Sequence, residues 1–512
     1  MNPVPGQPRA RPYWLLGALA VLLAIPVAWA GAALLAAAVG AAILAAVRSW
    51  AARRAGVELG AEPGVLLGSD QLGRAVRLSD QQLSAHGLIL GASGAGKSTT
   101  LLAILTDQVR RGRPVVAIDM KGSPAFAATL AAAAAAAGRP FRRWTPDGPS
   151  HWNPLAHGNP TELKDRLIAT ERFTEPHYQR AAERYIQTAL QVLQAAHPGR
   201  SPQLEELVGT MEPRRLSALL RQLPRPAAER VQDYLASLTP DQHSAIRGLG
   251  TRLALVSESH TGRYLSDVGA GDGAGGRGAI DLRAALAGEQ VVLFSLNSGT
   301  YGQLSAQLGT LAIQDLVSSV GERLRAGERS PDGDGAGIEA GRGAGDADRP
   351  SPAIIAIDEF SALGSDNVIA LLARAREAGV SVLLCTQELA DLDRAAHGLR
   401  DQVLGNTAIK LAHRQDVPAS AQTIAQMAGT EKAWEETRQL GGRLLAGHET
   451  RRGTRRQVEQ FIVHPNEIKT LPPGEAVLIS KLPPARARTV RVTAPQLSRP
   501  RGPARRGDEL AR

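Results

Sequence analysis

The sequence predicts an α/β fold with a mostly parallel sheet, and three observations support this prediction. A glycine-rich loop at 91–98 lies between a short apolar run, 88–90, and a segment with helical spacing, 99–109. Later apolar runs also end in polar side chains and lead into helical patterns, as the strands of a parallel sheet do. Between about 152 and 264 the strand pattern disappears and helical periodicity replaces it. We therefore expect an all-α insertion within the α/β domain.

The composition is that of a long, basic chain. With 512 residues there is room for two or three domains, and a formal net charge of +10 favours an acidic polymer or an anionic membrane face as a partner. The single cysteine, Cys385, excludes an internal disulfide and a cysteine-based zinc site. It lies in an apolar run, which predicts a buried and inert thiol.

The N-terminal region predicts a membrane anchor. The run 13–47 contains no charged residue, and Pro26 and Gly31 interrupt its middle. A single crossing takes about 20 apolar residues, so this run favours a two-helix hairpin over its alternative, one long tilted helix. Arginines at both flanks place both ends in the cytoplasm and the protein in the inner membrane. The flanking arginines are Arg9, Arg11, Arg48, Arg53 and Arg54.

The remaining chain divides by changes of pattern. A cytoplasmic segment, 1–12, precedes the hairpin, and a lead-in with two strand-like stretches, 48–84, follows it. Residues 326–350 and 495–512 hold few large apolar side chains, and we expect a disordered loop and a disordered basic tail there. The predicted nucleotide-binding domain is then built from 85–151, 268–325 and 351–494, with the all-α insertion at 152–267. Near its end we expect two strands, 458–463 and 476–479, to close the domain.

The loop at 91–98 fits the phosphate-binding pattern Gly-x4-Gly-Lys-[Ser/Thr]. Its glycines let backbone N–H groups turn toward a phosphate, and the following helix adds partial positive charge at its N-terminus. We expect Lys97 to reach the β- and γ-phosphates and Ser98 to bind Mg²⁺, so ATP and Mg²⁺ are the expected ligands. A chance match to a glycine-rich turn is the alternative, and the flanking strand and helix argue against it. The predicted nucleotide-binding residues are Gly91, Ala92, Ser93, Gly94, Ala95, Gly96, Lys97, Ser98 and Thr99.

A second motif supplies the groups that a phosphate-binding loop needs for hydrolysis. The apolar run 352–357 ends in Asp358 and Glu359. We expect Asp358 to hold the Mg²⁺ shell and Glu359 to polarise the attacking water. The run 379–386 ends in Gln387, whose amide is suited to sensing the γ-phosphate or orienting water; its alternative role is to cap a loop at the end of a strand.

Two arginines, Arg374 and Arg376, precede the strand at 379–386. An arginine at a subunit edge can complete the nucleotide site of a neighbouring subunit. The alternative for either residue is an ordinary surface salt bridge. The residue pattern alone does not choose between the two arginines.

Taken together, these stretches resemble the type IV coupling proteins of bacterial conjugation, the TraD/TraG type, within the FtsK/HerA class of hexameric RecA-like DNA motors. The resemblance rests on 91–98 and five further stretches: Ala117-Ile-Asp-Met-Lys-Gly122, Trp152-Asn-Pro-Leu155, Ala356-Ile-Asp-Glu-Phe360, Arg376-Glu-Ala-Gly379 leading to Gln387, and Gly405-Asn-Thr-Ala-Ile-Lys410 with Arg414. It implies that Arg376 is the arginine that acts in a neighbouring subunit. It also implies a homo-hexamer that contacts DNA, relaxosome proteins and components of a type IV secretion channel. The sequence departs from the family in its very short periplasmic turn and in the extra segment 326–350.

The expected function is therefore an ATPase, anchored in the membrane, that pumps DNA toward a secretion channel. The DNA is expected to be single-stranded and linked to a relaxase. An FtsK-type translocase of double-stranded DNA is one alternative, although 465–512 is short for a C-terminal winged-helix module. An ATPase that drives protein secretion is another, and a non-catalytic scaffold is a third.

Overall fold

The computed structural model describes residues 64–171, 173, 175–267, 279–328, 351–363, 365–441, 448–483 and 486–495. The predicted hairpin at 13–47, most of the segment 326–350 and nearly all of the basic tail lie outside these residues. Within the part of the chain that is described, no helix is both long enough and apolar enough to cross a membrane.

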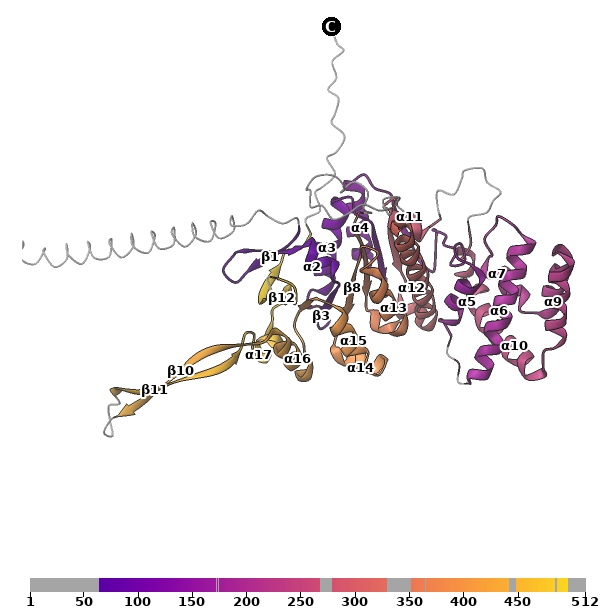
Figure 1. Cartoon of the computed structure of the whole chain (residues 1–512). Coiled ribbons are helices and arrows are strands. Elements are labelled where there is room, and N and C mark those ends of the chain that lie inside the picture. The colour runs from indigo at the N-terminus through magenta and orange to yellow at the C-terminus, as the bar shows by residue number, and fades with distance from the viewer. Residues whose placement is uncertain are drawn as a thin grey trace, which may run out of the picture. The chain divides into compact units, whose positions relative to one another are not determined.

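The described residues form one large sheet of 11 strands, in the order β2-β1-β13-β12-β9-β3-β8-β7-β4-β6-β5 (Figure 1). From β9 to β5 all neighbouring strands are parallel, whereas β9, β12, β13 and β1 pair antiparallel in succession. The prediction of an α/β fold with a mostly parallel sheet is confirmed. The strands are β1 (Gly64–Asp70), β2 (Ala75–Ser79), β3 (Gly87–Leu90), β4 (Val115–Asp119), β5 (Phe141–Trp144), β6 (Val291–Ser295), β7 (Ala353–Asp358), β8 (Val380–Thr386), β9 (Ile409–Ala412), β12 (Glu475–Ser480) and β13 (Ala487–Val492).

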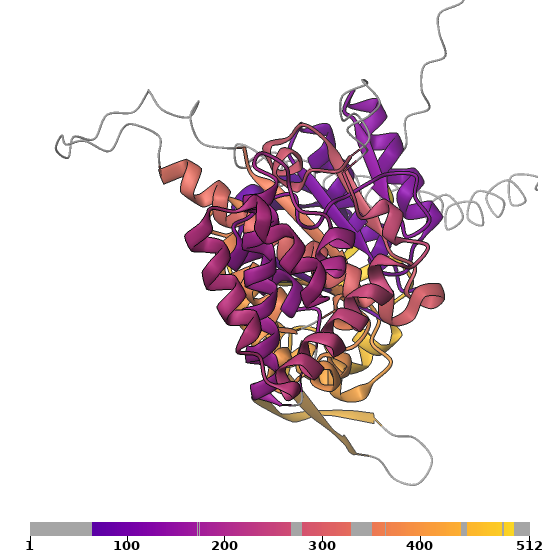
Figure 2. The same ribbon diagram turned by 90° about the vertical axis from the view of Figure 1, so that its right-hand side faces the viewer.

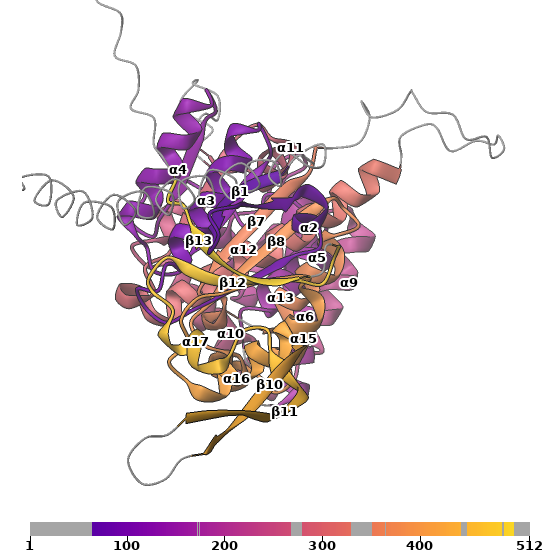
Figure 3. The same ribbon diagram turned by 90° about the vertical axis from the view of Figure 1, so that its left-hand side faces the viewer.

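Side-chain alternation along the central strands separates two hydrophobic cores. On β3, Ile89 packs into the core that α3 and α4 cover, whereas Leu88 and Leu90 face the core beneath α12 and α13. Because both faces are covered, the central strands are buried throughout and are apolar at nearly every position. Figure 3 shows the sheet from the side of β12 and β13. The helices of this domain are α2 (Asp80–Ser84), α3 (Lys97–Arg110), α4 (Pro124–Ala136), α11 (Leu282–Ala287), α12 (Ser298–Glu328), α13 (Ser365–Ala375), α14 (Leu389–Ala395) and α15 (Leu399–Asn406).

The insertion is all-α, as predicted, and its helices lie together in Figure 2. Its buried attachment to the α/β domain centres on Asp315 of α12, which pairs with Arg166 (3.1 Å) and accepts a hydrogen bond from Trp152 Nε1 (3.0 Å). Arg166 and Asp315 are almost fully buried, so this ion pair fixes the insertion at one point. The helices are α5 (Pro160–Ile168), α6 (Pro176–Ala196), α7 (Leu204–Thr210), α8 (Pro213–Leu219), α9 (Arg225–Ala236) and α10 (Pro240–Ser257).

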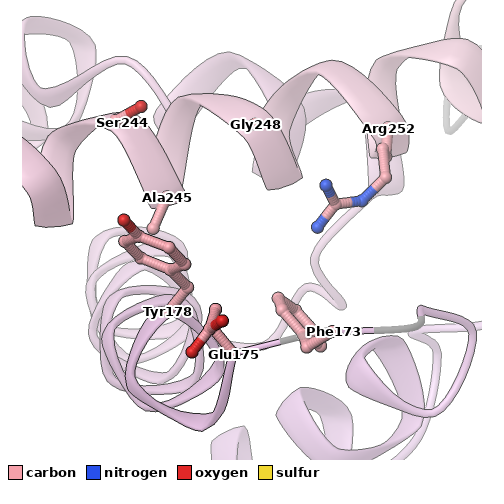
Figure 4. Close-up of a pocket in the computed structure, with 7 residues that line it drawn as sticks. All are labelled: Phe173, Glu175, Tyr178, Ser244, Ala245, Gly248 and Arg252. Atoms are coloured by element: carbon pink, nitrogen blue, oxygen red, sulfur yellow. The ribbon is translucent and has the colours of Figure 1, made fainter.

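A second attachment runs past a cavity of about 280 Å³ between α6 and α10 (Figure 4). Arg252 lines this cavity with Phe173 and Tyr178, and its Nε donates to Glu171 (2.6 Å). The same carboxylate accepts from Gln307 of α12 (3.3 Å). Glu171 therefore connects the insertion to the α/β domain beside the cavity.

The C-terminal part contains a two-stranded ribbon that the sequence did not predict. β10 (Thr430–Gly441) and β11 (His448–Phe461) pair only with each other, between α16 (Pro418–Ala428) and α17 (Pro465–Thr470) (Figure 1). The expectation that 458–463 forms a strand closing the main domain is wrong, because this stretch pairs with β10 instead. The strand predicted at 476–479 is β12 and does join the main sheet.

Candidate nucleotide-binding site

The glycine-rich loop connects β3 to α3, as its sequence predicts. Its first amides are held by neighbouring segments: Gly91 N–H donates to the carbonyl of Gln387 (3.2 Å), and Ala92 N–H to that of Arg414 (2.8 Å). Gly96 caps α3 with a φ of +114°, and a Cβ there would lie 3.0 Å from the backbone nitrogen of Gly474. Glycine is therefore required at this position. The first N–H groups of α3 have no acceptor within the helix and point toward the space where an anion would bind.

Lys97 lies inside this loop. Its ammonium donates to the carbonyls of Gly91 and Ala92, the latter at 3.1 Å, and only 5% of the residue is exposed. Burial, and after it the charge of Lys121, lowers the pKa of Lys97. A phosphate oxygen is a stronger partner for this ammonium than a peptide carbonyl, because the pair is then fully ionic.

Ser98 and Asp358 lie side by side at the mouth of the loop. Ser98 Oγ donates to Asp358 Oδ2 at 3.4 Å, while Asp358 Oδ1 is buried and has no hydrogen-bond partner among the described residues. A buried carboxylate oxygen with an unused lone pair next to a hydroxyl fits Mg²⁺, which binds one or two protein oxygens and completes its shell with phosphates and water. The described ranges contain no cluster of three or more His, Cys, Asp or Glu residues that could hold a metal.

Glu359 follows directly, with its backbone in the left-handed region at a φ of +60°. Both of its carboxylate oxygens are engaged: Oε1 accepts from Gln387 Nε2 (2.6 Å), and Oε2 lies 3.3 Å from the ammonium of Lys121. An uncommon backbone conformation of this kind persists only where surrounding contacts hold it. The three residues thus come from the ends of three neighbouring strands, β7, β8 and β4.

Lys121 is fixed by the turn that follows β4. The carboxylate of Asp119 accepts from the backbone N–H groups of Lys121 (2.9 Å) and Ser123 (2.6 Å). Gly122 has a φ of +68°, and a Cβ there would lie 2.8 Å from the Cβ of Asn297. Burial would lower the pKa of Lys121, but the charges of Asp358 and Glu359 outweigh it and raise this pKa.

His413 supports the loop from behind, and sequence reasoning missed it. It follows β9, its Nε2 lies 2.9 Å from Thr100 Oγ1, and its Nδ1 lies 2.8 Å from the carbonyl of Glu475. A Cβ on Gly91 would lie 2.6 Å from the Cβ of His413, so the two backbones are in close contact. Burial lowers the pKa of His413 to about 4, so the ring is neutral at pH 7. The only signal in the sequence is its position at the carboxyl end of a predicted strand.

The structure does not bring Arg374 or Arg376 to the site of their own chain. Both side chains are exposed: Arg374 lies in the last turn of α13 and Arg376 on the turn between α13 and β8, at the amino end of the parallel strands. Lys97, Asp358 and Gln387 lie at the opposite, carboxyl end. Arg376 lies near His86, whose pKa is lowered to about 4 mainly by burial and further by the charge of Arg376.

Comparison with known proteins agrees with this geometry. Residues 352–473 match the family model described as the TraM recognition site of TraD and TraG. No curated protein matches the chain. Among solved structures, the bacterial conjugative coupling protein TrwBdeltaN70 in its unbound form has a TM-score of 0.58 at 14% identity and covers 85% of this chain and 90% of its own.

Two further structures share the fold. The plasmid coupling protein TrwB in complex with ADP and Mg²⁺ has a TM-score of 0.58 at 14% identity, over 85% of this chain and 91% of that one. VirB4 of Thermoanaerobacter pseudethanolicus has a TM-score of 0.51 at 13% identity, over 85% and 98%. The resemblance to TraD/TraG-type coupling proteins is confirmed, by the family model for residues 352–473 and by the fold for most of the chain.

Proposed function

We propose that this protein is an ATP-hydrolysing motor of the coupling-protein type, which moves DNA toward a secretion channel during conjugative transfer. One observation carries the proposal. The phosphate-binding loop, Asp358, Glu359 and Gln387 converge at the carboxyl edge of a parallel sheet, in a chain whose residues 352–473 match a TraD/TraG family model. The bound ADP and Mg²⁺ of the TrwB structure support the same nucleotide and ion here.

The chemistry follows from the positions of the side chains. The loop amides and Lys97 bind the phosphates and neutralise their charge. Ser98 and Asp358 would hold Mg²⁺, which would supply further charge neutralisation at the phosphates. Glu359 accepts a proton from the attacking water, and Gln387, hydrogen-bonded to Glu359, keeps that carboxylate oriented. The exposed Arg376 of a second copy completes the site, which requires a ring such as a homo-hexamer.

The proposed cargo and partners rest on the net charge and on the family match. The net charge of +10 and the family match favour DNA, which we propose is single-stranded and linked to a relaxase. The family model is described as a recognition site for TraM, which supports contacts with relaxosome proteins. We also propose that 13–47 anchors the motor in the inner membrane, beside the components of a type IV secretion channel.

The test is ATP hydrolysis by the full-length protein, purified in detergent, with and without DNA. We expect hydrolysis that single-stranded DNA stimulates more than double-stranded DNA, and no hydrolysis by Lys97→Ala protein. DNA affinity should fall steeply between low and physiological salt. Equal stimulation by duplex DNA would favour an FtsK-type translocase, and an absence of salt-dependent DNA binding would favour a protein-secretion motor.

Membrane anchoring is tested separately. Deleting 13–47 should move the protein from the membrane fraction to the soluble fraction while its ATPase activity is retained. Retention of the deletion variant in carbonate-washed membranes would contradict the anchor.

A further inference from the structure

We propose that Lys121 is a positioning residue that alternates between two anions: it pairs with Glu359 until the terminal phosphate of ATP takes its place. This inference rests on the proposed function and assigns a regulator to the same site. In the arrangement seen here Glu359 is held, and arrival of the terminal phosphate releases it.

Both carboxylate oxygens of Glu359 are engaged in its present contacts. Gln387 occupies Oε1 at 2.6 Å and Lys121 occupies Oε2 at 3.3 Å. Neither oxygen is therefore free to orient the attacking water. Release of Lys121 frees one oxygen for the attacking water, while Gln387 continues to orient the other.

The backbone of Lys121 is held in place, but its side-chain stem is not. Asp119 binds the N–H groups on either side of Gly122, and Gly122 packs closely against Asn297. The side chain of Lys121 remains 37% exposed. A lysine carries its charge on a flexible four-carbon stem, so the ammonium can change partner without any movement of the turn.

The ammonium groups of Lys97 and Lys121 repel each other across the site. An anion bound between two like charges relieves their repulsion, and a terminal phosphate carries more charge than a carboxylate. The phosphate therefore competes successfully with Glu359 for Lys121. ADP lacks the γ-phosphate and therefore leaves the Lys121–Glu359 pair in place.

The decisive measurement is the affinity of full-length protein for ADP and for a non-hydrolysable ATP analogue, by isothermal titration with Mg²⁺. Lys121→Met should weaken analogue binding roughly tenfold and leave ADP binding unchanged, because only the terminal phosphate contacts Lys121. Glu359→Gln should strengthen analogue binding, since it removes the competing anion, and this gain should vanish in the double variant. Lys121→Arg should retain most of the analogue affinity.

A purely structural salt bridge would behave differently. Lys121→Met would then lower the melting temperature and change the affinities for ADP and the analogue equally, or change neither, and either result overturns the proposal. Lys432→Met, on the exposed ribbon, is the matched control for loss of one lysine charge. If the wild-type protein binds both nucleotides but fails to hydrolyse ATP, the proposed function fails while the affinity ratio still decides the role of Lys121.

Discussion

The parallel half of the large sheet carries the reactive side chains, whereas the antiparallel half supports the phosphate-binding loop. In the parallel half, β4, β7 and β8 are each followed within two residues by a polar side chain of the candidate nucleotide site, namely Lys121, Glu359 and Gln387. In the antiparallel half, β12 and the segment after β9 contribute no group to the chemistry. They supply His413, the carbonyl of Glu475 and the turn at Gly474, which press against the phosphate-binding loop from behind.

The difference shows how reactive groups and their support can be separated in one sheet. Parallel strands place their carboxyl ends at the same edge, so side chains distant in sequence gather there. β9, which is parallel to β3 and antiparallel to β12, brings His413 to the reverse of the loop at its carboxyl end. β12 brings the carbonyl of Glu475 there at its amino end. Changes in the parallel half should therefore abolish turnover, whereas changes in the antiparallel half should weaken binding and folding.

The largest effect is expected from Asp358→Asn. Loss of the carboxylate charge removes the main protein ligand for Mg²⁺, and we expect kcat for ATP to fall by on the order of 10³-fold. Steady-state ATPase assays measure this, with circular dichroism to check folding. A decrease of only a few fold would show that Asp358 does not hold the catalytic ion.

Arg376→Ala should come next, because it tests a residue that lies away from its own site. We expect a decrease in kcat of on the order of 10²-fold, and a much smaller decrease for the neighbouring Arg374→Ala. Mixing inactive Arg376→Ala and Lys97→Ala subunits should restore part of the activity, since some interfaces then combine an intact loop with an intact arginine. No recovery on mixing would argue against action between subunits.

His413→Ala tests the antiparallel half. It leaves Thr100 and the carbonyl of Glu475 without their partner, and we expect the free energy of unfolding to fall by about 2 kcal/mol. KM for ATP should rise roughly tenfold, with a smaller change in kcat, because the substitution loosens the loop and removes no reactive group. The exposed His397→Ala is the control. A kcat effect as large as that of Asp358→Asn would break the distinction between the halves.

At neutral pH the smallest expected effect comes from buried histidines, which make the stability of both halves depend on pH. Burial lowers the pKa of His86 and of His413 from 6.5 to about 4 in the folded protein. The unfolded chain therefore binds more protons between these values, so stability is complete above pH 6.5 and is lost as the pH falls toward 4. Urea unfolding from pH 7 to 4.5 should show a shallower loss for His86→Gln and for His413→Gln. An unchanged slope in both variants would contradict the neutral, buried rings.

The sequence predicted those parts of the fold that depend on local pattern. The loop at 91–98, the strand ending in Asp358 and the helical insertion each carry their signal within a few consecutive residues. β5 was missed because Phe141-Arg-Arg-Trp144 has neither an apolar run nor alternation, although β6 pairs with it in the folded sheet. The roles of His413 and Lys121 depend on which strands are neighbours, and strand order is not written in any short motif.

The ribbon of β10 and β11 joins the rest of the chain through one narrow neck. Thr430 pairs with Phe461, and the N–H of Ile462 donates to the carbonyl of Gly429 at 3.0 Å, so the ribbon begins and ends at the same place. Residues 431–460 can thus be shortened, lengthened or exchanged as a cassette at little cost, since loop closure depends only weakly on length. Trp434, which is 54% exposed and lies beneath the guanidinium of Arg455, is part of this exchangeable segment. Substitutions in the ribbon can therefore change its binding partners without altering the candidate nucleotide site.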